Sequence, residues 1–309
     1  MSTSVSTHSS QPAAQSAVRN SSASQQLKFE RFRPRLGALV SGFDLAQPFD
    51  DTTRTHLQRA VLEYGVLYFR DQQFSPERFV EIARVFGEPY KQNSYSHSLE
   101  GFGDVEVLEN SKTRHQKADV WHADVTWQPN PPKATILHAQ ELPKEGGDTV
   151  WASTAAAYDL LDPRLAAYLE TLTAVNSFEV SRLQEYLQTD YYGRFPKEGG
   201  KKRLADARAD HPPVEVPVIA THPETGRKVI NVNEGHTLYI KGVSRVAGNS
   251  LLTLLFDLIK TPDIQARFHW KPGSVAVWDN RQVQHYGVND YGNEFRKFHR
   301  LTIREPALS

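Results

Sequence analysis

The chain has 309 residues, and its 36 Lys and Arg residues balance 36 Asp and Glu residues, so the formal net charge is zero. This balance argues against a protein that holds nucleic acid mainly through phosphates. The absence of cysteine excludes disulfides, zinc–thiolate sites, iron–sulfur clusters and a cysteine nucleophile. No run approaches the ~20 apolar residues that cross a bilayer. We therefore expect a cytoplasmic protein with no membrane or nucleic-acid partner.

The first 26 residues differ from the rest of the chain in composition. They are mostly Ser, Thr, Gln, Ala and Asn, with Arg19 as their one charged residue. Such a segment cannot bury enough apolar surface to offset the entropy of ordering it, so we predict a disordered tail over residues 1–26. A transit peptide is also rich in Ser and poor in acids, but it usually carries more Arg. A secretory signal would need an apolar core, which is missing here.

From residue 27 onward, the apolar pattern predicts folded structure. Near-alternation predicts short strands around residues 27–32 and 37–42. Helical spacing over 57–64 predicts a helix that ends at Gly65, followed by a compact strand over 66–69. Ser75-Pro76 is typical of a helix start, and the apolar spacing extends that helix to Gly87.

Beyond residue 100, short strand-like runs dominate the chain. Two helices interrupt them, one opened by Asp162-Pro163 and one over residues 250–260, while residues 181–211 are charged and loop-like. This pattern predicts a single domain over residues 27–309 that is mainly β with flanking helices, a sandwich or barrel. The strand-like runs are 105–108, 134–137, 149–151, 214–219, 229–232, 275–278 and 301–303.

The segment 120–126, Val-Trp-His-Ala-Asp-Val-Thr, carries the densest chemical signal. On an extended segment, His122 and Asp124 point to the same face. They would supply two of the three ligands of a 2-His-1-carboxylate iron site. Taken alone, the pair is a weak signal, because a surface His beside an Asp is the more common reason for such a short motif.

A third ligand must come from another part of the chain. His285 is a candidate, because it follows the predicted strand 275–278 and strands of a β-sandwich return to neighbouring positions. Arg296 and Arg300 lie at i and i+4 of the last strand and share a face there. Guanidinium groups bind carboxylates bidentately, which suits an acidic ligand. Two surface arginines on an edge strand would be the alternative.

Together these motifs resemble the taurine dioxygenase-like (TauD/TfdA) family of non-haem Fe(II)/2-oxoglutarate-dependent dioxygenases. The resemblance runs from about residue 29 to about residue 304, and the order and spacing of its motifs agree throughout. The segments that carry it are 36–45, 121–126, 141–151, 231–235 and 278–281, together with His285, Arg296 and Arg300.

The resemblance implies a double-stranded β-helix, that is, a jelly roll with a cupin-like core and flanking helices. It implies that His122, Asp124 and His285 bind Fe(II), and that Thr149 and Arg296 bind the distal carboxylate of 2-oxoglutarate. Arg300 would lie near the anionic end of the substrate. The reaction would use O2, convert 2-oxoglutarate to succinate and CO2, and oxidise a substrate C–H bond. The resemblance gives the motif 278–281 an architectural role and no catalytic task.

The same resemblance bears on the substrate. Taurine-selective relatives read taurine with a His and a Tyr before the HxD motif and with an Asn four residues before the first iron ligand. Here Tyr95 matches the Tyr, Gln92 or Asn93 replaces the His, and Ala118 replaces the Asn. We therefore predict a small organic anion other than taurine: an alkyl sulfate, another sulfonate or a carboxylate. Residues 91–97 and 181–211 are the expected lids.

Alternatives in other classes stay open at this point. One is a non-catalytic, metal-stabilised jelly-roll binding protein, and another is a zinc or manganese cupin-type isomerase. A dioxygenase could also end in desaturation or decarboxylation instead of hydroxylation. Relatives are commonly dimers or tetramers, so we expect a homo-oligomer.

Overall fold

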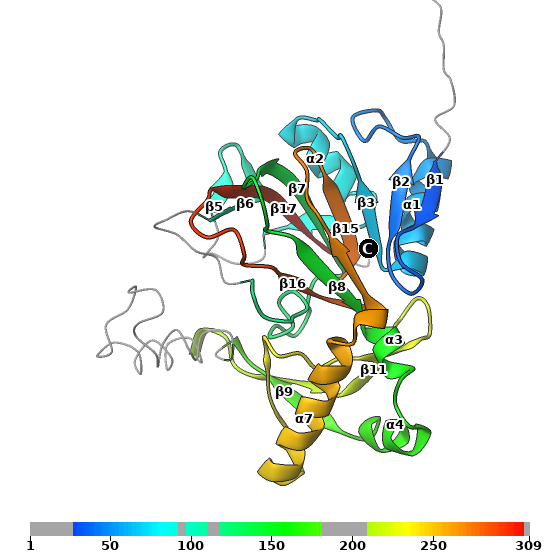
Figure 1. Cartoon of the computed structure of the whole chain (residues 1–309), viewed down its shortest axis with the longest axis vertical. Coiled ribbons are helices and arrows are strands. Elements are labelled where there is room, and N and C mark those ends of the chain that lie inside the picture. The colour runs from blue at the N-terminus through cyan, green and yellow to red at the C-terminus, as the bar shows by residue number, and fades with distance from the viewer. Residues whose placement is uncertain (1–26, 92–96, 111–117, 179, 181–208, 306–309) are drawn as a thin grey trace, which may run out of the picture.

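The computed structural model describes residues 27–91, 97–110, 118–178, 180 and 209–305 (Figure 1). The predicted tail lies outside these residues, as do Gln92, Asn93, Tyr95 and nearly all of the predicted lid 181–211. Within the described residues the chain is mainly β with helices at its flanks, which confirms the predicted fold class at that level.

A nine-stranded sheet is the largest layer, and it combines strands from both ends of the chain. Its order is β1-β2-β3-β15-β7-β17-β6-β5, with β4 paired to β17 beside this path. All its pairs are antiparallel except β2 with β3. The strands are β1 Lys28–Arg31, β2 Ala38–Ser41, β3 Val66–Phe69, β4 Glu88–Tyr90, β5 His97–Leu99, β6 Phe102–Asn110, β7 Ala134–Glu141, β15 Val275–Asp279 and β17 Arg296–Arg304.

Helices α1 (Asp51–Tyr64) and α2 (Pro76–Ala83) cover one face of this sheet. The carboxylate of Asp50 caps α1 by accepting a hydrogen bond from the Thr53 amide, and the helix ends at Gly65 as predicted. The apolar side chains that lie between these helices and the sheet form a continuous core, because alternate residues of each strand point to the same face. It includes Leu57, Ala60, Leu67, Phe69, Phe79, Ile82, Val275 and Val277.

The helix α2 ends at Ala83, earlier than the predicted end at Gly87. The chain must turn quickly here, because β4 begins at Glu88 and pairs with the end of β17. Gly87 has φ +151°, and a Cβ at this position would lie 2.5 Å from the carbonyl oxygen of Arg304. Only glycine fits so close an approach of two backbones.

A second sheet, of order β14-β8-β16, faces the other side of the large sheet. Its strands are β14 (Gln265–Phe268), β8 (Thr149–Ser153) and β16 (Val283–Gly287). Large aromatic side chains fill the space between the two sheets. The ring of Tyr68 stacks on Phe268 at 4.4 Å, and Trp151 meets Trp278 at 5.6 Å. Strands β14 and β8 thus lie opposite β3 and β15.

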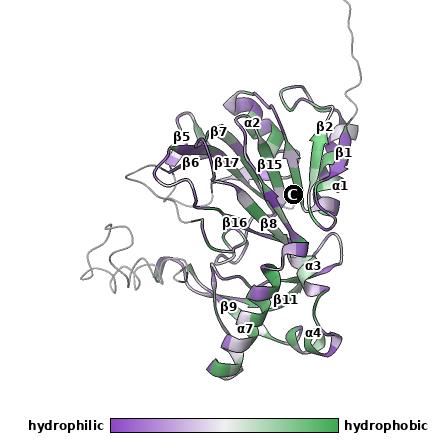
Figure 2. Cartoon of the chain, viewed as in Figure 1, coloured by the Kyte–Doolittle hydropathy of each residue, from purple (hydrophilic) through white to green (hydrophobic). Residues whose placement is uncertain are grey.

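The remaining elements form a smaller layer with its own core. The helix α7 starts at Arg245, before the predicted start at residue 250, because the Ser244 hydroxyl caps it by accepting from the Ala247 amide. None of the described helices has the length and apolar character to cross a membrane. Figure 2 shows that α7 is apolar along much of its length. The elements are α3 Thr154–Tyr158, α4 Pro163–Leu169, β9 Thr173–Asn176, β10 Val214–Pro217, β11 Ile219–Thr221, β12 Lys228–Ile230, β13 Thr237–Ile240, α7 Arg245–Ile259 and η1 Pro262–Ile264.

Candidate metal centre and active site

Three predicted ligands converge at one point between the two sheets. His122 and His285 form an isolated antiparallel β-bridge, in which each backbone amide donates to the other residue's carbonyl oxygen, at 3.1 and 2.8 Å. The bridge sets the two imidazole rings 4.2 Å apart. The Oδ1 atom of Asp124 lies 3.9 Å from the Nε2 atom of each ring. One donor atom from each residue thus falls within 4.8 Å of the others.

Neighbouring groups orient two of these ligands. The Nδ1 atom of His122 lies 2.7 Å from the carbonyl oxygen of Val120, which fixes the proton on Nδ1 and leaves Nε2 as a donor for a metal. The hydroxyl of Thr135 donates to Oδ2 of Asp124 at 2.8 Å, so that Oδ1 faces the two rings. Contacts of this kind hold metal ligands in one tautomer and one orientation.

The electrostatic environment keeps the triad in its metal-binding form. Burial, followed by the nearby His122, lowers the pKa of His285 to about 3, so this imidazole is neutral at ordinary pH. Burial alone would raise the pKa of Asp124, but His285, Arg300 and His122 together lower it. A neutral imidazole at His285 and a carboxylate at Asp124, with the imidazole of His122 beside them, form a donor set that suits ferrous iron or a similar divalent metal.

The backbone that carries Asp124 is strained. The sequence favours an extended segment, but Asp124 begins a turn that runs to Trp127. The next residue, Val125, has φ +56°, in the left-handed region that β-branched residues avoid. Such a conformation costs on the order of 1–3 kcal/mol and persists only where the surroundings enforce it. Convergence of His122 and Asp124 therefore comes from a bridge and a turn, and not from the pleat of one strand.

The predicted 2-oxoglutarate residues lie near each other. Arg296 begins β17, and its Nη2 atom donates to the carbonyl oxygen of Gly147, two residues before Thr149, at 2.8 Å. Burial lowers the pKa of Arg296, and its Nε atom has no hydrogen-bond partner in the described part of the chain. The hydroxyl of Thr149 accepts from the indole of Trp270 at 2.9 Å. A buried donor without a partner is the feature expected where an anionic ligand binds.

Arg300 lies beside the triad, but it already has a protein counter-ion. Its Nε atom donates to Oε2 of Glu106 at 2.8 Å, and its Nη1 atom is 3.7 Å from Oδ1 of Asp124. Glu106 is 0% exposed and lies on the inner face of β6. Burial would lower the pKa of Arg300, but the charges of Glu106 and Asp124 raise it. The buried guanidinium is therefore compensated by carboxylates of the protein itself.

The remaining predicted substrate residue, Ala118, lies close to the centre. Its carbonyl oxygen accepts from the amide of Gly287 at 2.7 Å, two residues after His285. The sequence did not single out Tyr90 or His236. Burial raises the pKa of Tyr90 to about 12, with Asp124 adding to the shift, and the ring of His236 lies 6.1 Å from that of His122. Among the described residues, neither the Tyr90 hydroxyl nor Nδ1 of His236 has a hydrogen-bond partner.

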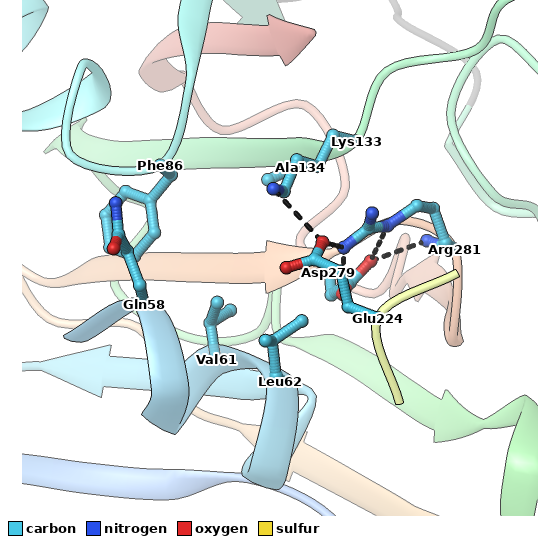
Figure 3. Close-up of a pocket in the computed structure, with 9 residues that line it drawn as sticks. All are labelled: Gln58, Val61, Leu62, Phe86, Lys133, Ala134, Glu224, Asp279 and Arg281. Carbon is cyan, nitrogen blue, oxygen red and sulfur yellow. Dashed lines mark hydrogen bonds and ion pairs between the residues drawn. The ribbon is translucent and has the colours of Figure 1, made fainter. Parts of the chain in front are cut away.

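The motif 278–281 connects the centre to a separate hollow of about 160 Å³ on the α1 side of the sheet (Figure 3). Trp278 packs on the ring of His285 at 4.9 Å. Asp279 and Arg281 line the hollow and bond to each other. Asn280 instead contacts the backbone of Asp124. The hollow is lined by Gln58, Val61, Leu62, Phe86, Lys133, Ala134, Glu224, Asp279 and Arg281.

Comparison with known proteins agrees with this fold and site. Residues 28–302 match the model of the family described as "Taurine catabolism dioxygenase TauD, TfdA family". The chain is 33% identical over 283 residues to an alkylsulfatase of Acinetobacter baylyi, covering 90% of this chain and 85% of that protein. It is 33% identical over 274 residues to an alpha-ketoglutarate-dependent sulfate ester dioxygenase of Pseudomonas putida, covering 87% and 86%. A crystal structure of a taurine dioxygenase from Burkholderia xenovorans superposes with a TM-score of 0.75 at 29% identity, covering 90% and 89%.

A two-layer β core with a His-Asp-His cluster between its sheets is the arrangement expected of an oxidoreductase of the dioxygenase class, and the family match shows that class for this chain. The chain belongs to the TauD/TfdA family, and it is a 2-oxoglutarate-dependent dioxygenase.

Proposed function

We propose that this protein uses Fe(II), 2-oxoglutarate and O2 to oxidise a C–H bond of a small organic anion. The observation that carries the proposal is the cluster of His122, Asp124 and His285 beside the guanidinium of Arg300. When bound, ferrous iron would supply the oxidation, coupled to conversion of 2-oxoglutarate to succinate and CO2. The protein's part is to hold the metal, to orient both organic acids and to exclude water.

Each ligand has a defined role in this proposal. Nε2 of His122, Nε2 of His285 and Oδ1 of Asp124 would bind the iron, because these atoms face one another and their partner atoms are engaged elsewhere or buried. The aromatic wall formed by Trp151 and Trp278 packs against His285 and limits the access of water from that side.

We further propose that Arg296 and Thr149 bind the distal carboxylate of 2-oxoglutarate. The Nε donor of Arg296 has no partner within the described chain, and the guanidinium is packed on the ring of Phe298 at 4.4 Å. Both features leave a rigid, desolvated cation available to a carboxylate.

For Arg296→Ala we expect the KM for 2-oxoglutarate to rise about 30-fold or more, because loss of one partner of a buried charge pair costs roughly 2–5 kcal/mol. Arg296→Lys should recover only part, since an ammonium group cannot make the forked contact. The control is Lys297→Ala, a neighbour that contacts Glu109 on the opposite face of β17. An unchanged KM in Arg296→Ala would place the carboxylate elsewhere.

The substrate proposal is an alkyl sulfate, another sulfonate or a carboxylate, with taurine excluded. Relatives named for sulfate esters support it. The replacement of the taurine-reading His by Gln92 or Asn93, and of the Asn by Ala118, argues against the taurine amine. The anionic end would lie near Arg300, and Tyr95 stays a predicted substrate residue outside the described part of the chain. Glu106 pairs with Arg300 and so weakens its attraction for a bound anion. We therefore expect the substrate to be a monoanion with an extended apolar part rather than a compact, highly charged acid.

The experiment is a panel of taurine, a medium-chain alkyl sulfate, an alkyl sulfonate and an aryloxy carboxylate, each supplied with Fe(II), 2-oxoglutarate and ascorbate. Oxygen uptake, succinate and oxidised product are measured together for the wild type and Arg300→Ala. We expect coupled turnover of the alkyl sulfate or sulfonate and its loss in Arg300→Ala. Preferred turnover of taurine, or of a substrate indifferent to Arg300→Ala, would contradict the substrate proposal.

We also propose that residues 27–309 form one domain of the double-stranded β-helix type. The support is the facing pair of sheets, with the ligands of β16 and of the 122–124 segment between them. A homo-oligomer and a lid over residues 181–211 remain part of this proposal.

A further inference from the structure

The position of Asp124 depends on a backbone contact from a distant part of the chain. Oδ1 of Asn280 accepts from the amide of Asp124 at 2.7 Å, and Nδ2 of Asn280 donates to the carbonyl oxygen of Asp124 at 2.9 Å. The same Nδ2 atom donates to the carbonyl oxygen of Pro132 at 3.1 Å. One buried side-chain amide thus satisfies both backbone groups of a metal ligand, as a neighbouring strand would.

This contact falls next to the strained residue. Val125 holds its left-handed conformation directly after Asp124, and it is 5% exposed. On its other side, Nδ2 of Asn176 donates to the carbonyl oxygen of Thr126 at 3.0 Å. Hydrogen bonds from two asparagines therefore flank the strained peptide, and they supply the enforcement that such a conformation requires.

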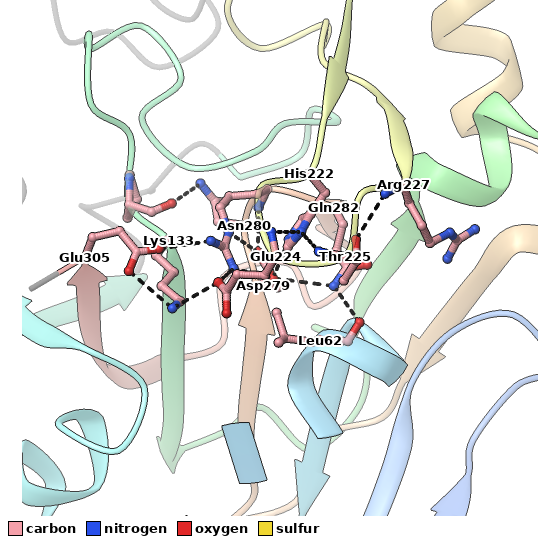
Figure 4. Close-up of polar contacts among 12 residues, drawn as sticks. Leu62, Lys133, His222, Glu224, Thr225, Arg227, Asp279, Asn280, Gln282 and Glu305 are labelled. Atoms are coloured by element: carbon pink, nitrogen blue, oxygen red, sulfur yellow. Dashed lines mark hydrogen bonds and ion pairs between the residues drawn. The ribbon is translucent and has the colours of Figure 1, made fainter. Parts of the chain in front are cut away.

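Asn280 is itself fixed by the residues around it (Figure 4). Its amide donates to the carbonyl oxygen of Lys133 at 2.9 Å. Its neighbour Asp279 accepts from Nε2 of His222 at 2.9 Å and from Nη2 of Arg281 at 2.8 Å. The contacts of Asp279 with His222 and Arg281 therefore hold this segment on the side of the hollow. On its other side, the side chain of Asn280 contacts the backbone of Asp124.

We propose that Asn280 is a positioning residue that sets the affinity of the metal centre by holding Asp124 and the strained Val125 in place. Without the amide, Val125 relaxes toward the extended region, and the Cα–Cβ bond of Asp124 rotates away from His122 and His285. The hydrogen bond from Thr135 alone cannot prevent this, because it acts on the carboxylate and not on the backbone. The inference rests on the proposed ligand set.

The test measures Mn(II) binding to the metal-free full-length protein by calorimetry, and the visible spectrum of the Co(II) form. We expect Asn280→Ala to weaken Mn(II) binding roughly 10- to 100-fold, the range for residues that orient metal ligands, and to change the Co(II) spectrum. The matched control is Gln72→Ala, which removes another buried amide that bonds two backbone groups, in the segment between β3 and α2. It should leave Mn(II) affinity within about threefold and the Co(II) spectrum unchanged, because no ligand depends on it.

A second variant separates positioning from a general loss of stability. Val125→Gly removes the steric penalty at φ +56°, so the double variant Val125→Gly/Asn280→Ala should bind Mn(II) several-fold more tightly than Asn280→Ala. If Asn280 served only to stabilise the fold, the double variant would bind Mn(II) no more tightly than Asn280→Ala. If Asn280→Ala does not fold, Asn280→Asp tests the same point, because it keeps the acceptor and loses both donors.

Asp124→Ala distinguishes the two levels of the argument. If Asp124→Ala binds Mn(II) like the wild type, the ligand set itself is wrong. If Asp124→Ala loses Mn(II) while Asn280→Ala and Asn280→Asp bind it as tightly as Gln72→Ala does, the ligand set stands and the role of Asn280 is refuted.

Discussion

The surroundings of Glu106 in the fold differ from those that its neighbours in the sequence predict. Asp104, Glu106 and Glu109 stand in a strand whose acids are typical of a solvated face, yet Glu106 is fully buried against Arg300. A buried carboxylate is retained only when a cation compensates it. Glu106 and Arg300 therefore form a unit whose net charge is close to zero at the wall of the centre.

We expect Glu106→Gln to lower the KM for an anionic alkyl sulfate roughly 3- to 10-fold, because removing one partly screened charge near the substrate is worth about 1 kcal/mol. Gln keeps the acceptor for Nε of Arg300, so the guanidinium stays in place. The KM for 2-oxoglutarate should change much less. Steady-state kinetics with each substrate varied in turn provides the measurement.

Glu109→Gln is the control, since Glu109 contacts Lys297 on the outer face of the same strand, at 3.8 Å. A higher KM for the sulfate in Glu106→Gln would mean that the charge of Glu106 serves to orient Arg300 and not to limit its attraction for anions.

At the scale of elements, the contact between β7 and α2 contains a buried titratable group. His138 of β7 packs on Phe74 and Phe79, with ring centroids at 4.3 and 5.9 Å, and its Nε2 atom lies 3.2 Å from the carbonyl oxygen of Gln72. Burial lowers its pKa to about 4. The unfolded chain, with a pKa near 6.5, therefore takes up a proton before the folded protein does.

The stability that neutral His138 provides is complete above pH 6.5 and is lost as the pH falls toward 4. His138→Phe cannot titrate, so its free energy of unfolding should gain about 2–3 kcal/mol relative to the wild type between pH 7 and pH 4. Urea unfolding at several pH values measures this. Parallel stability curves for the two proteins would show that His138 does not titrate as proposed.

The sequence predicted elements with strong local patterns and missed those defined by their partners. Compact apolar runs located β3, β7 and β15, and the signals at Gly65 and Asp162 located one end of α1 and the start of α4. β9, β13 and β14 were missed, because each is only four residues long and is stabilised by pairing that no local pattern encodes.

The residues of the candidate site also divide into those that the sequence predicted and those that it missed. The residue types at His122, Asp124 and His285 were predictable from motifs, since ligand chemistry restricts them. The contacts of Glu106 with Arg300 and of Asn280 with Asp124 were not, because they join strands and turns far apart in the sequence. The expected common face of His122 and Asp124 was reached by a different route, through the turn at Val125.

At the scale of the whole molecule, one ion-pair network connects segments that are far apart in the sequence. Asp279 at the end of β15 bonds to His222 and Arg281, and Arg281 also pairs with Glu224 and Glu305, at 2.7 and 3.0 Å. The network thus connects the large sheet, the 222–225 turn and the end of β17. Burial alone would raise the pKa of Asp279, but hydrogen bonds from Arg281 and His222 lower it to about 2.

Asp279→Asn should cost about 3 kcal/mol of unfolding free energy at pH 7, because it leaves Arg281 without its buried partner. This difference should shrink by roughly 2 kcal/mol as the pH falls from 4 to 2, since the lowered pKa means that the wild type loses the contribution of Asp279 over that range. Asp159→Asn, which breaks an exposed pair with Arg227, should change stability by less than about 1 kcal/mol. A pH-independent loss in Asp279→Asn would contradict the assignment.

The bridge between His122 and His285 also makes the backbone a reporter of the metal. Both amide protons lie in this single pair of hydrogen bonds, and both side chains are proposed ligands of the same ion. Opening the bridge then requires release of at least one ligand, so hydrogen exchange at these two amides is gated by metal dissociation. Two protons on segments more than a hundred residues apart would thus slow together when the metal binds.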